Sequence, residues 1–357
     1  MKKILQLTIL LFALTGTLFG QTLYVANNNP GAASGTNVFT GSTALQDAIA
    51  AASTVAPFDI IYVVPSSVAY GQITIDRGIT IFGIGIRPNK DIGKKSLVGP
   101  VYINSSEVRI SGLSGPTNGG VFMGWSGGDT TYVNIIIENS YMREIRQTNV
   151  ATVGLDNLLI RNNIVFNDGW QGIELYTTST VNITNNVIYC NRSTGNIYGD
   201  GLQIFNNLFV GDGTSTSRAV ATAKNCTFDH NIFYGAYVTL TSASTGNVWD
   251  DNLSFGSTGD TFSVGSYSNT SNSPNLEGMD PMFVDMPKSL TWTNAHDFSL
   301  QALSPALNVN GTDIGPSGGA NPFISEGNIL PLIQTVTIPA TIPVGSDLPV
   351  KIKAKGN

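Results

Sequence analysis

The sequence predicts an all-β fold, a parallel β-helix solenoid with three short strands in each coil. A short phrase with Asn as its second residue is written six times between residues 139 and 252, at intervals of 24, 23, 21, 24 and 21 residues. Such a period is typical of solenoids. Apolar side chains alternate with polar ones on both sides of this Asn, which indicates two half-buried strands. The second residues of the phrases are Asn139, Asn163, Asn186, Asn207, Asn231 and Asn252.

Each phrase is interpreted as a bend between two strands. One residue in the left-handed region turns the chain sharply, and Asn tolerates that region better than other non-Gly residues. We therefore expect the repeated Asn to be left-handed and its amide to bond to the coils above and below. The residues three places before it should form a buried column: Ile136, Ile160, Ile183, Ile204, Phe228 and Trp249.

The remaining half of each period has room for a third strand, for which Gly172–Tyr176 and Tyr237–Leu240 are candidates. A further strand is predicted at Thr261–Val264. Leucine-rich repeats and propeller blades are excluded, because the first needs its own leucine frame and the second about twice this length. Coils of about 21–24 residues with three strands leave the β-helix as the prediction.

The two ends of the chain differ from the repeat. Residues 43–53 predict a capping helix, with Thr43 as N-cap, Gln46 completing a capping box, and an apolar stripe that covers the first coil. Residues 276–320 are expected to form an irregular terminal module of a β-helix domain spanning 21–320. Two strand candidates, 335–338 and 348–354, suggest a C-terminal β tail over 321–357.

Composition bounds the compartment and the partners. Lys2, Lys3 and the apolar run from Ile4 to Phe19 predict a secretory signal peptide over residues 1–20, and hence an extracellular or cell-surface protein. The formal charge of −6 becomes −8 without those two lysines, which disfavours nucleic acid and anionic membranes. No second apolar run predicts a membrane span. Export permits a bridge between Cys190 and Cys226, but buried free thiols are the expectation.

The chain resembles the right-handed parallel β-helix (pectate-lyase-like) superfamily of the secreted bacterial type. Residues 167–175 with 181–189 look like its generic coil, 23–26 and 59–65 like its usual beginning, and 280–285 with 297–307 like its usual end. The resemblance covers roughly residues 22–320 and implies a right-handed coil and a carbohydrate partner. It is nearly silent on activity, because the superfamily holds lyases, hydrolases, epimerases and non-catalytic surface proteins.

Familiar catalytic and metal motifs are missing from the sequence. Two His and two Cys give no zinc-ligand spacing, so we predict no metal, with Ca²⁺ left open as a cofactor. Thr227–His230 is similar only in part to a pectate-lyase signature, and the acidic pattern of polygalacturonases is absent.

The resemblance implies a polysaccharide groove on the outer face of the first sheet. There, Glu174 and Asp200 are candidate acid and base, since adjacent coils about 4.8 Å apart would bring carboxylates from neighbouring coils near the spacing of an inverting hydrolase. Arg218 is the third catalytic candidate, and Arg143 and Arg146 are expected on adjoining loops. The predicted substrate-binding residues are Asp168, Trp170, Tyr176, Tyr198 and Tyr237.

Two functions remain open at this point. The first is a monomeric exported β-helix that binds glycans or serves as a surface structure without catalysis. The alternative is a polysaccharide lyase or glycoside hydrolase acting in the groove. Stacked ionisable residues in the groove would favour the enzyme, and a groove lined with small polar residues would favour the non-catalytic protein.

Overall fold

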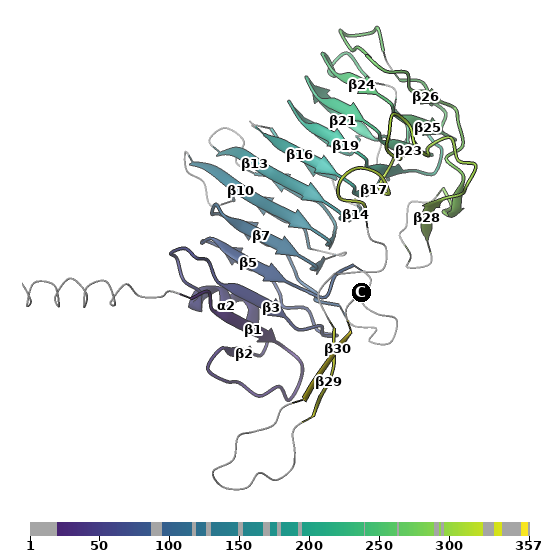
Figure 1. Ribbon diagram of the computed structural model, residues 1–357. Helices are drawn as coiled ribbons and strands as arrows, with labels where there is room; N and C mark the ends of the chain where they lie inside the picture. The colour runs from purple at the N-terminus through teal and green to yellow at the C-terminus, as the bar shows by residue number, and fades with distance from the viewer. Residues whose placement is uncertain are drawn as a thin grey trace, which may run out of the picture.

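The three parallel sheets of a solenoid of about eight turns make up most of the protein (Figure 1). This computed structural model describes residues 20–355 except 87–94, 116–118, 126–129, 149–152, 167–171, 177–179, 192–194, 239, 263, 289–292, 294–295, 324–331 and 338–350. The predicted parallel β-helix is confirmed, and helix is a minor component. The signal peptide prediction lies outside the described residues.

The largest sheet has eleven strands, which are hydrogen-bonded in the order given. They are β2 (Val38–Thr40), β1 (Leu23–Asn27), β3 (Ile60–Val63), β5 (Ile79–Phe82), β7 (Val108–Ser111), β10 (Thr130–Glu138), β13 (Val153–Arg161), β16 (Val181–Thr184), β19 (Gln203–Phe205), β22 (Thr227–Asp229) and β24 (Val248–Asp250). Their neighbours pair in parallel, as one coil stacks on the next.

The other two sheets complete each coil. The eight-stranded sheet contains β26 (Leu276–Glu277), β25 (Leu253–Phe255), β23 (Ile232–Tyr234), β20 (Leu208–Val210), β17 (Val187–Tyr189), β14 (Ile164–Phe166), β11 (Tyr141–Met142) and β8 (Ser114–Gly115). The seven-stranded sheet contains β21 (Val220–Lys224), β18 (Ile197–Asp200), β15 (Ile173–Glu174), β12 (Ile145–Gln147), β9 (Val121–Met123), β6 (Val101–Ile103) and β4 (Ile73–Ile75).

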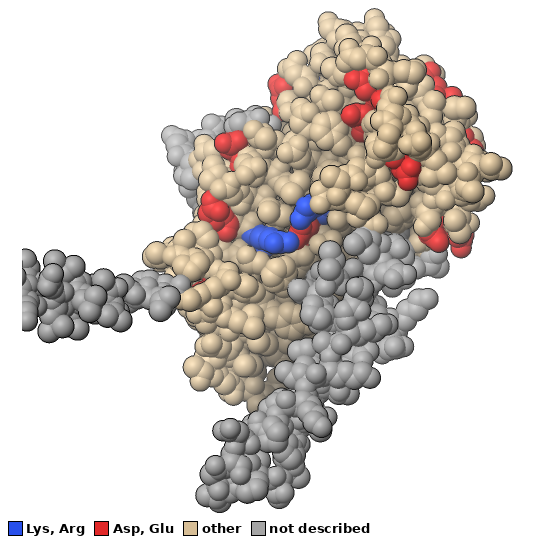
Figure 2. All heavy atoms as spheres, in the orientation of Figure 1, with Lys and Arg blue, Asp and Glu red and all other residues tan. Residues whose placement is uncertain are grey.

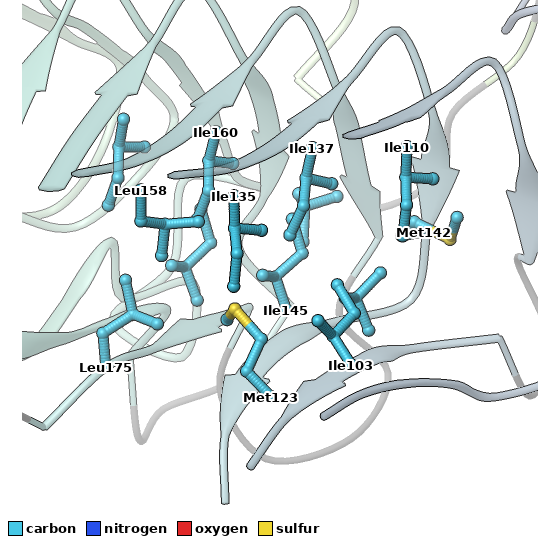
Figure 3. Packing of buried hydrophobic residues seen from close by; sticks show 14 of the residues in the cluster. Ile103, Ile110, Met123, Ile135, Ile137, Met142, Ile145, Leu158, Ile160 and Leu175 are labelled. Carbon is cyan, nitrogen blue, oxygen red and sulfur yellow. The ribbon is translucent and has the colours of Figure 1, made fainter. Parts of the chain in front are cut away.

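Rows of aliphatic side chains fill the interior. Ile110, Ile137 and Ile160 occupy matching positions on neighbouring strands and are fully buried. In Figure 3 this row lies on one side of the core, and Met123 and Leu175 lie on the opposite side. Burying one such side chain contributes about 1.5–3 kcal/mol, so the repeated rows are the main source of stability.

Aromatic stacking continues the core toward the C-terminal coils. The rings of Phe228 and Trp249 lie 4.0 Å apart with an interplanar angle of 2°, which confirms the core position predicted for Trp249. Phe209 and Phe233 stack in the same way at 4.7 Å. Identical column positions on successive coils force such stacks, because the coils repeat at the strand spacing.

A ladder of buried asparagines runs along the bend between the eleven-stranded and eight-stranded sheets. In each step the Oδ1 of one Asn accepts both the backbone N–H and the Nδ2–H of the Asn one coil earlier; Asn186 donates to Asn207 Oδ1 at 3.0 and 2.9 Å. The Nδ2 of Asn186 also donates to the Ile160 carbonyl at 2.9 Å. The predicted amide stacking is therefore confirmed. The ladder comprises Asn163, Asn186, Asn207, Asn231, Asn252 and Asn275.

The left-handed residue is predicted correctly at Asn139 and one position too late in the other five phrases. The residues with positive φ are those just before the ladder, namely Asn139, Asn162, Asn185, Asn206, His230 and Asp251. Asn139 thus corresponds to Asn162, and Ser140 takes the ladder position in that coil. For the same reason Ile137, rather than the predicted Ile136, is the buried residue. The bend needs two residues, one to turn the chain and one to satisfy buried backbone groups.

The capping helix is α2 (Ala44–Ala51), and its predicted apolar stripe is buried, with Leu45, Ala48 and Ile49 on the helix and Ala52 just after it. The predicted capping box is not formed. Thr43 makes no side-chain cap and donates to Asp47 Oδ2 instead. Gln46 bonds in both directions with the backbone of Thr74, which joins the helix to β4.

Two other local predictions need correction. In the described part of Tyr237–Leu240, the strand pairing is limited to an isolated bridge between Tyr237 and Arg218. The described part of Thr261–Val264 contains no strand; Phe262 packs there on Trp249 and Phe233.

Outside the coils, two antiparallel pairs follow. β27 (Phe283–Asp285) pairs with β28 (Asp297–Leu300), and β29 (Leu332–Thr337) pairs with β30 (Lys351–Lys355), close to the predicted tail strands.

Both cysteines are buried and free. Burial raises the pKa of both thiols, that of Cys226 to about 12. No helix within the described ranges combines the length and apolar character of a membrane span.

Asn207→Ala should destabilise the protein by about 2–6 kcal/mol, because it leaves the Asn186 N–H and the Ile183 carbonyl buried without these partners. Denaturant unfolding followed by circular dichroism measures the loss. The matched control is Asn157→Gly, which keeps a positive φ and removes only an exposed bond to Asn134. We expect it to cost less than about 1 kcal/mol. Equal losses in the two variants would contradict a stabilising role for the ladder.

Candidate functional site

One row of outward side chains crosses the seven-stranded sheet. We call it the outer row. Strand register aligns its members on successive coils. Each lies beside a buried Val or Ile on its own strand, except Thr222, which lies beside the buried Ala223, so the row faces outward. It comprises Tyr102, Phe122, Arg146, Glu174, Tyr198 and Thr222.

An aromatic group forms the N-terminal end of the outer row. The rings of Tyr102 and Phe122 stack at 5.4 Å, and Trp125 lies 4.8 Å from Tyr102. Trp125 is 58% exposed although it is large and apolar. An aromatic ring that is exposed to solvent and held in place by two neighbouring rings is suited to stacking against a ligand.

Charged side chains occupy the middle of the row. Glu174 is buried, and its Oε2 accepts from Arg146 Nε at 2.5 Å while its Oε1 accepts from the Tyr176 hydroxyl. Arg146 Nη1 also lies 3.5 Å from Oε2 of Glu144. One guanidinium therefore joins two carboxylates, and both oxygens of Glu174 are engaged.

Glu144 is the more unusual of the two carboxylates. Burial raises its pKa and the charge of Glu174 adds to the rise, while Arg146 and Arg143 oppose it. Gly120 lies against it, since a Cβ at that position would meet Glu144 Cγ at 2.8 Å. The Oε2 atom is covered and accepts no hydrogen bond from the described residues. A covered carboxyl and a fully bonded one leave little scope for acid–base chemistry on a bound polymer in this conformation.

Tyr198, near the C-terminal end of the outer row, packs against Tyr176, which lies just outside the row. Tyr176 and Tyr198 lie 4.7 Å apart, so these two predicted binding residues are brought together beside Glu174. Burial raises the pKa of the Tyr176 hydroxyl, and its bond to Glu174 raises it further. Farther along the sheet, the Arg218 guanidinium lies 5.3 Å from the Tyr237 ring centre. These two predicted residues therefore contact each other.

The remaining sequence predictions are placed less favourably. Tyr198, not Asp200, lies opposite Glu174, and Asp200 is an exposed residue at the end of β18 that accepts from Asn225 Nδ2 at 2.9 Å. The acid–base role of Glu174 and Asp200 stays a prediction. Asp168 and Trp170 lie outside the described residues.

Sequence reasoning missed four residues of this face, Tyr102, Phe122, Trp125 and Glu144. The first two alternate with buried residues in β6 and β9, a signal hidden by the irregular length of these early coils. Arg146 was expected on a loop, but it lies on β12. Ca²⁺ needs six or more oxygen ligands, and the outer row offers only carboxylates already paired with Arg146.

The face of the eleven-stranded sheet carries a second charged group. Figure 2 looks onto this face and shows basic atoms gathered at one place. Glu138 is buried there between Arg109 Nη2 at 2.5 Å and Arg161 Nη2 at 2.7 Å. Because the three side chains lie on consecutive strands, the group ties coils together.

Comparison with known families agrees with this geometry. A family model described as a right handed beta helix region matches residues 101–249. The match begins at β6 and ends within β24, so it includes the whole outer row, and the expected resemblance is confirmed at the level of the fold. No curated protein matches the chain.

Glu144→Gln should raise stability at neutral pH relative to the native protein. Because the folded pKa of Glu144 lies above its unfolded value, its favourable contribution is complete below the unfolded pKa and is lost as pH rises through the folded one. Gln resembles the protonated carboxyl and avoids this loss. The difference in urea midpoint should therefore be small near pH 4 and grow toward pH 8. Asp285→Asn, at an exposed carboxylate, is the control. A difference independent of pH would contradict the buried-carboxyl interpretation.

Proposed function

We propose that this protein is a secreted, non-catalytic β-helix that binds a polysaccharide or cell-surface glycan across the outer row. The observation that carries the proposal is the pair of aromatic groups, Trp125 with its neighbours at one end and Tyr176 with Tyr198 at the other. Sugar rings have apolar faces that pack on aromatic side chains, while their hydroxyls bond to polar groups between them.

The charge pattern favours a neutral glycan over a polyanion. Arg146 is the cation at the centre of the outer row, and it is already paired with Glu144 and Glu174. The chain as a whole carries a formal charge of −6. A polyanion would be repelled by the protein and would find Arg146 neutralised. A neutral polymer, which carries amides and hydroxyls, is not repelled by the charge of the protein.

Extracellular location and a monomeric state belong to the same proposal. The sequence of residues 1–20 has the features of a secretory signal peptide. A solenoid whose first coil is covered by α2 has its N-terminal edge protected, which supports a protein that need not pair with a second copy.

A polysaccharide lyase or hydrolase is the second candidate, and the raised pKa of Glu144 is the observation in its favour. A carboxyl that keeps its proton can serve as a general acid beside an ionised partner. Its covered Oε2 atom opposes this function, because a scissile bond could reach it only after the side chain moves.

Retention of the protein without residues 1–20 on a panel of insoluble and gel-embedded polysaccharides tests the proposal. On the polymer that retains it, Trp125→Ala and Tyr198→Ala should each weaken binding about threefold to tenfold, the usual worth of one aromatic contact. Tyr267→Ala is the matched control, because Tyr267 is also an exposed aromatic and lies outside the outer row.

Unchanged retention of both outer-row variants, or no retention on any polymer, would contradict the proposal. Release of unsaturated or reducing sugar ends by the native protein, abolished in Glu144→Gln, would instead establish the enzyme. Circular dichroism of each variant confirms that the solenoid is intact before binding is compared.

A further inference from the structure

Three side chains with metal-binding atoms converge on the asparagine bend, away from the outer row. One ligand atom from each of Asp229, His230 and Asp251 lies within 4.8 Å of the other two. Asp229 ends β22, and His230 and Asp251 are the left-handed residues of two successive coils. No metal-ligand spacing is visible in the sequence, because the stacking of coils, and not a local motif, brings Asp251 to His230.

These residues depart from the repeat. The left-handed position is Asn at residues 139, 162, 185 and 206, and it changes to His230 and then Asp251 in the next two coils. Asn, Asp and His all tolerate positive φ, so the backbone does not require the change. A local departure from a regular repeat without a backbone reason points to a function for the side chains.

The hydrogen bonds of His230 call for a cation. Its Nε2 lies 3.1 Å from the Val309 carbonyl oxygen, which only accepts, so Nε2 carries a hydrogen. In the neutral ring Nδ1 then presents a lone pair, yet it lies 2.5 Å from Asp229 Oδ1, another acceptor. A proton on Nδ1 accounts for this distance in the metal-free protein; a metal ion bound to both atoms would replace that proton and hold them about 3 Å apart.

The surroundings favour a metal ion. Asp251 adds a second carboxylate and is oriented by Asn310 Nδ2, which donates to both of its oxygens at 2.9 Å. A metal-bound His commonly donates its other N–H to a carbonyl, as His230 does to Val309. A hollow of about 340 Å³ lined by Asp229, His230 and Asn206 gives access from solvent.

We propose that Asp229, His230 and Asp251 form a binding site for one divalent transition metal such as Zn²⁺. One imidazole and two carboxylates suit such ions, whereas Ca²⁺ takes oxygen ligands almost exclusively. Three protein ligands leave a coordination position open toward the hollow. The ion would join two coils to residues 309–310, which lie in the terminal module. This proposal is independent of the glycan proposal.

Tag-free protein stripped with a chelator is titrated with Zn²⁺ by calorimetry and with Co²⁺ by visible absorption. We expect one equivalent to bind. His230→Asn and Asp251→Asn restore the Asn of the repeat at the same bend, so both should fold, and each should weaken binding by at least about tenfold. His296→Asn, at the second histidine of the sequence, should leave binding unchanged.

The proposal is overturned if the native protein binds neither ion, or if both bend variants bind as tightly as it does. Nitrogen NMR of His230 gives an independent readout. Loss of the Nδ1 proton signal with a metal-induced shift supports the site. Two protonated ring nitrogens in excess Zn²⁺ at pH 7 would assign the space to a proton and sink the idea.

Discussion

The amide ladder at the bend between the eleven-stranded and eight-stranded sheets is the interaction on which the rest of this protein depends. A solenoid coil turns sharply three times, and each turn removes backbone groups from water and from the sheet ladders. Here one side chain per coil, from Asn163 to Asn275, replaces those bonds with bonds to the coils on both sides. The bonds fit only when Asn is stacked on Asn. The ladder therefore fixes the vertical register of the coils as well as their shape.

Fixed register has a functional consequence on the opposite side of the solenoid. The outer row is a row only because Phe122, Arg146 and Glu174 occupy the same position on successive strands. A shift of one residue would turn each of these side chains into the core. The same stacking places His230 beside Asp251 at the bend. Both candidate sites are thus products of a regular backbone that carries irregular side chains.

This division explains what could be predicted from sequence. The fold, the buried columns and the stacked amides follow from periodicity, which is local and repeated many times. The left-handed residue was displaced by one because adjacent Asn residues, as at Asn162 and Asn163, make the two roles indistinguishable by spacing alone. Glu144 and Trp125 could not be found, because their burial and neighbours depend on which coils lie next to one another. Tyr176 and Tyr198 were found because they belong to the regular coils.

Hydrogen exchange of the free protein, resolved by peptide mass spectrometry, is the most direct test of the claim that the ladder and the outer row form one cooperative structure. Peptides containing Asn186, Asn207 and Asn231 and those containing β9, β12 and β15 should exchange with the same slow rate, through unfolding of the whole solenoid. Fast exchange in β9, β12 and β15 beside a protected ladder would contradict the claim, because the outer row would then lack a fixed register.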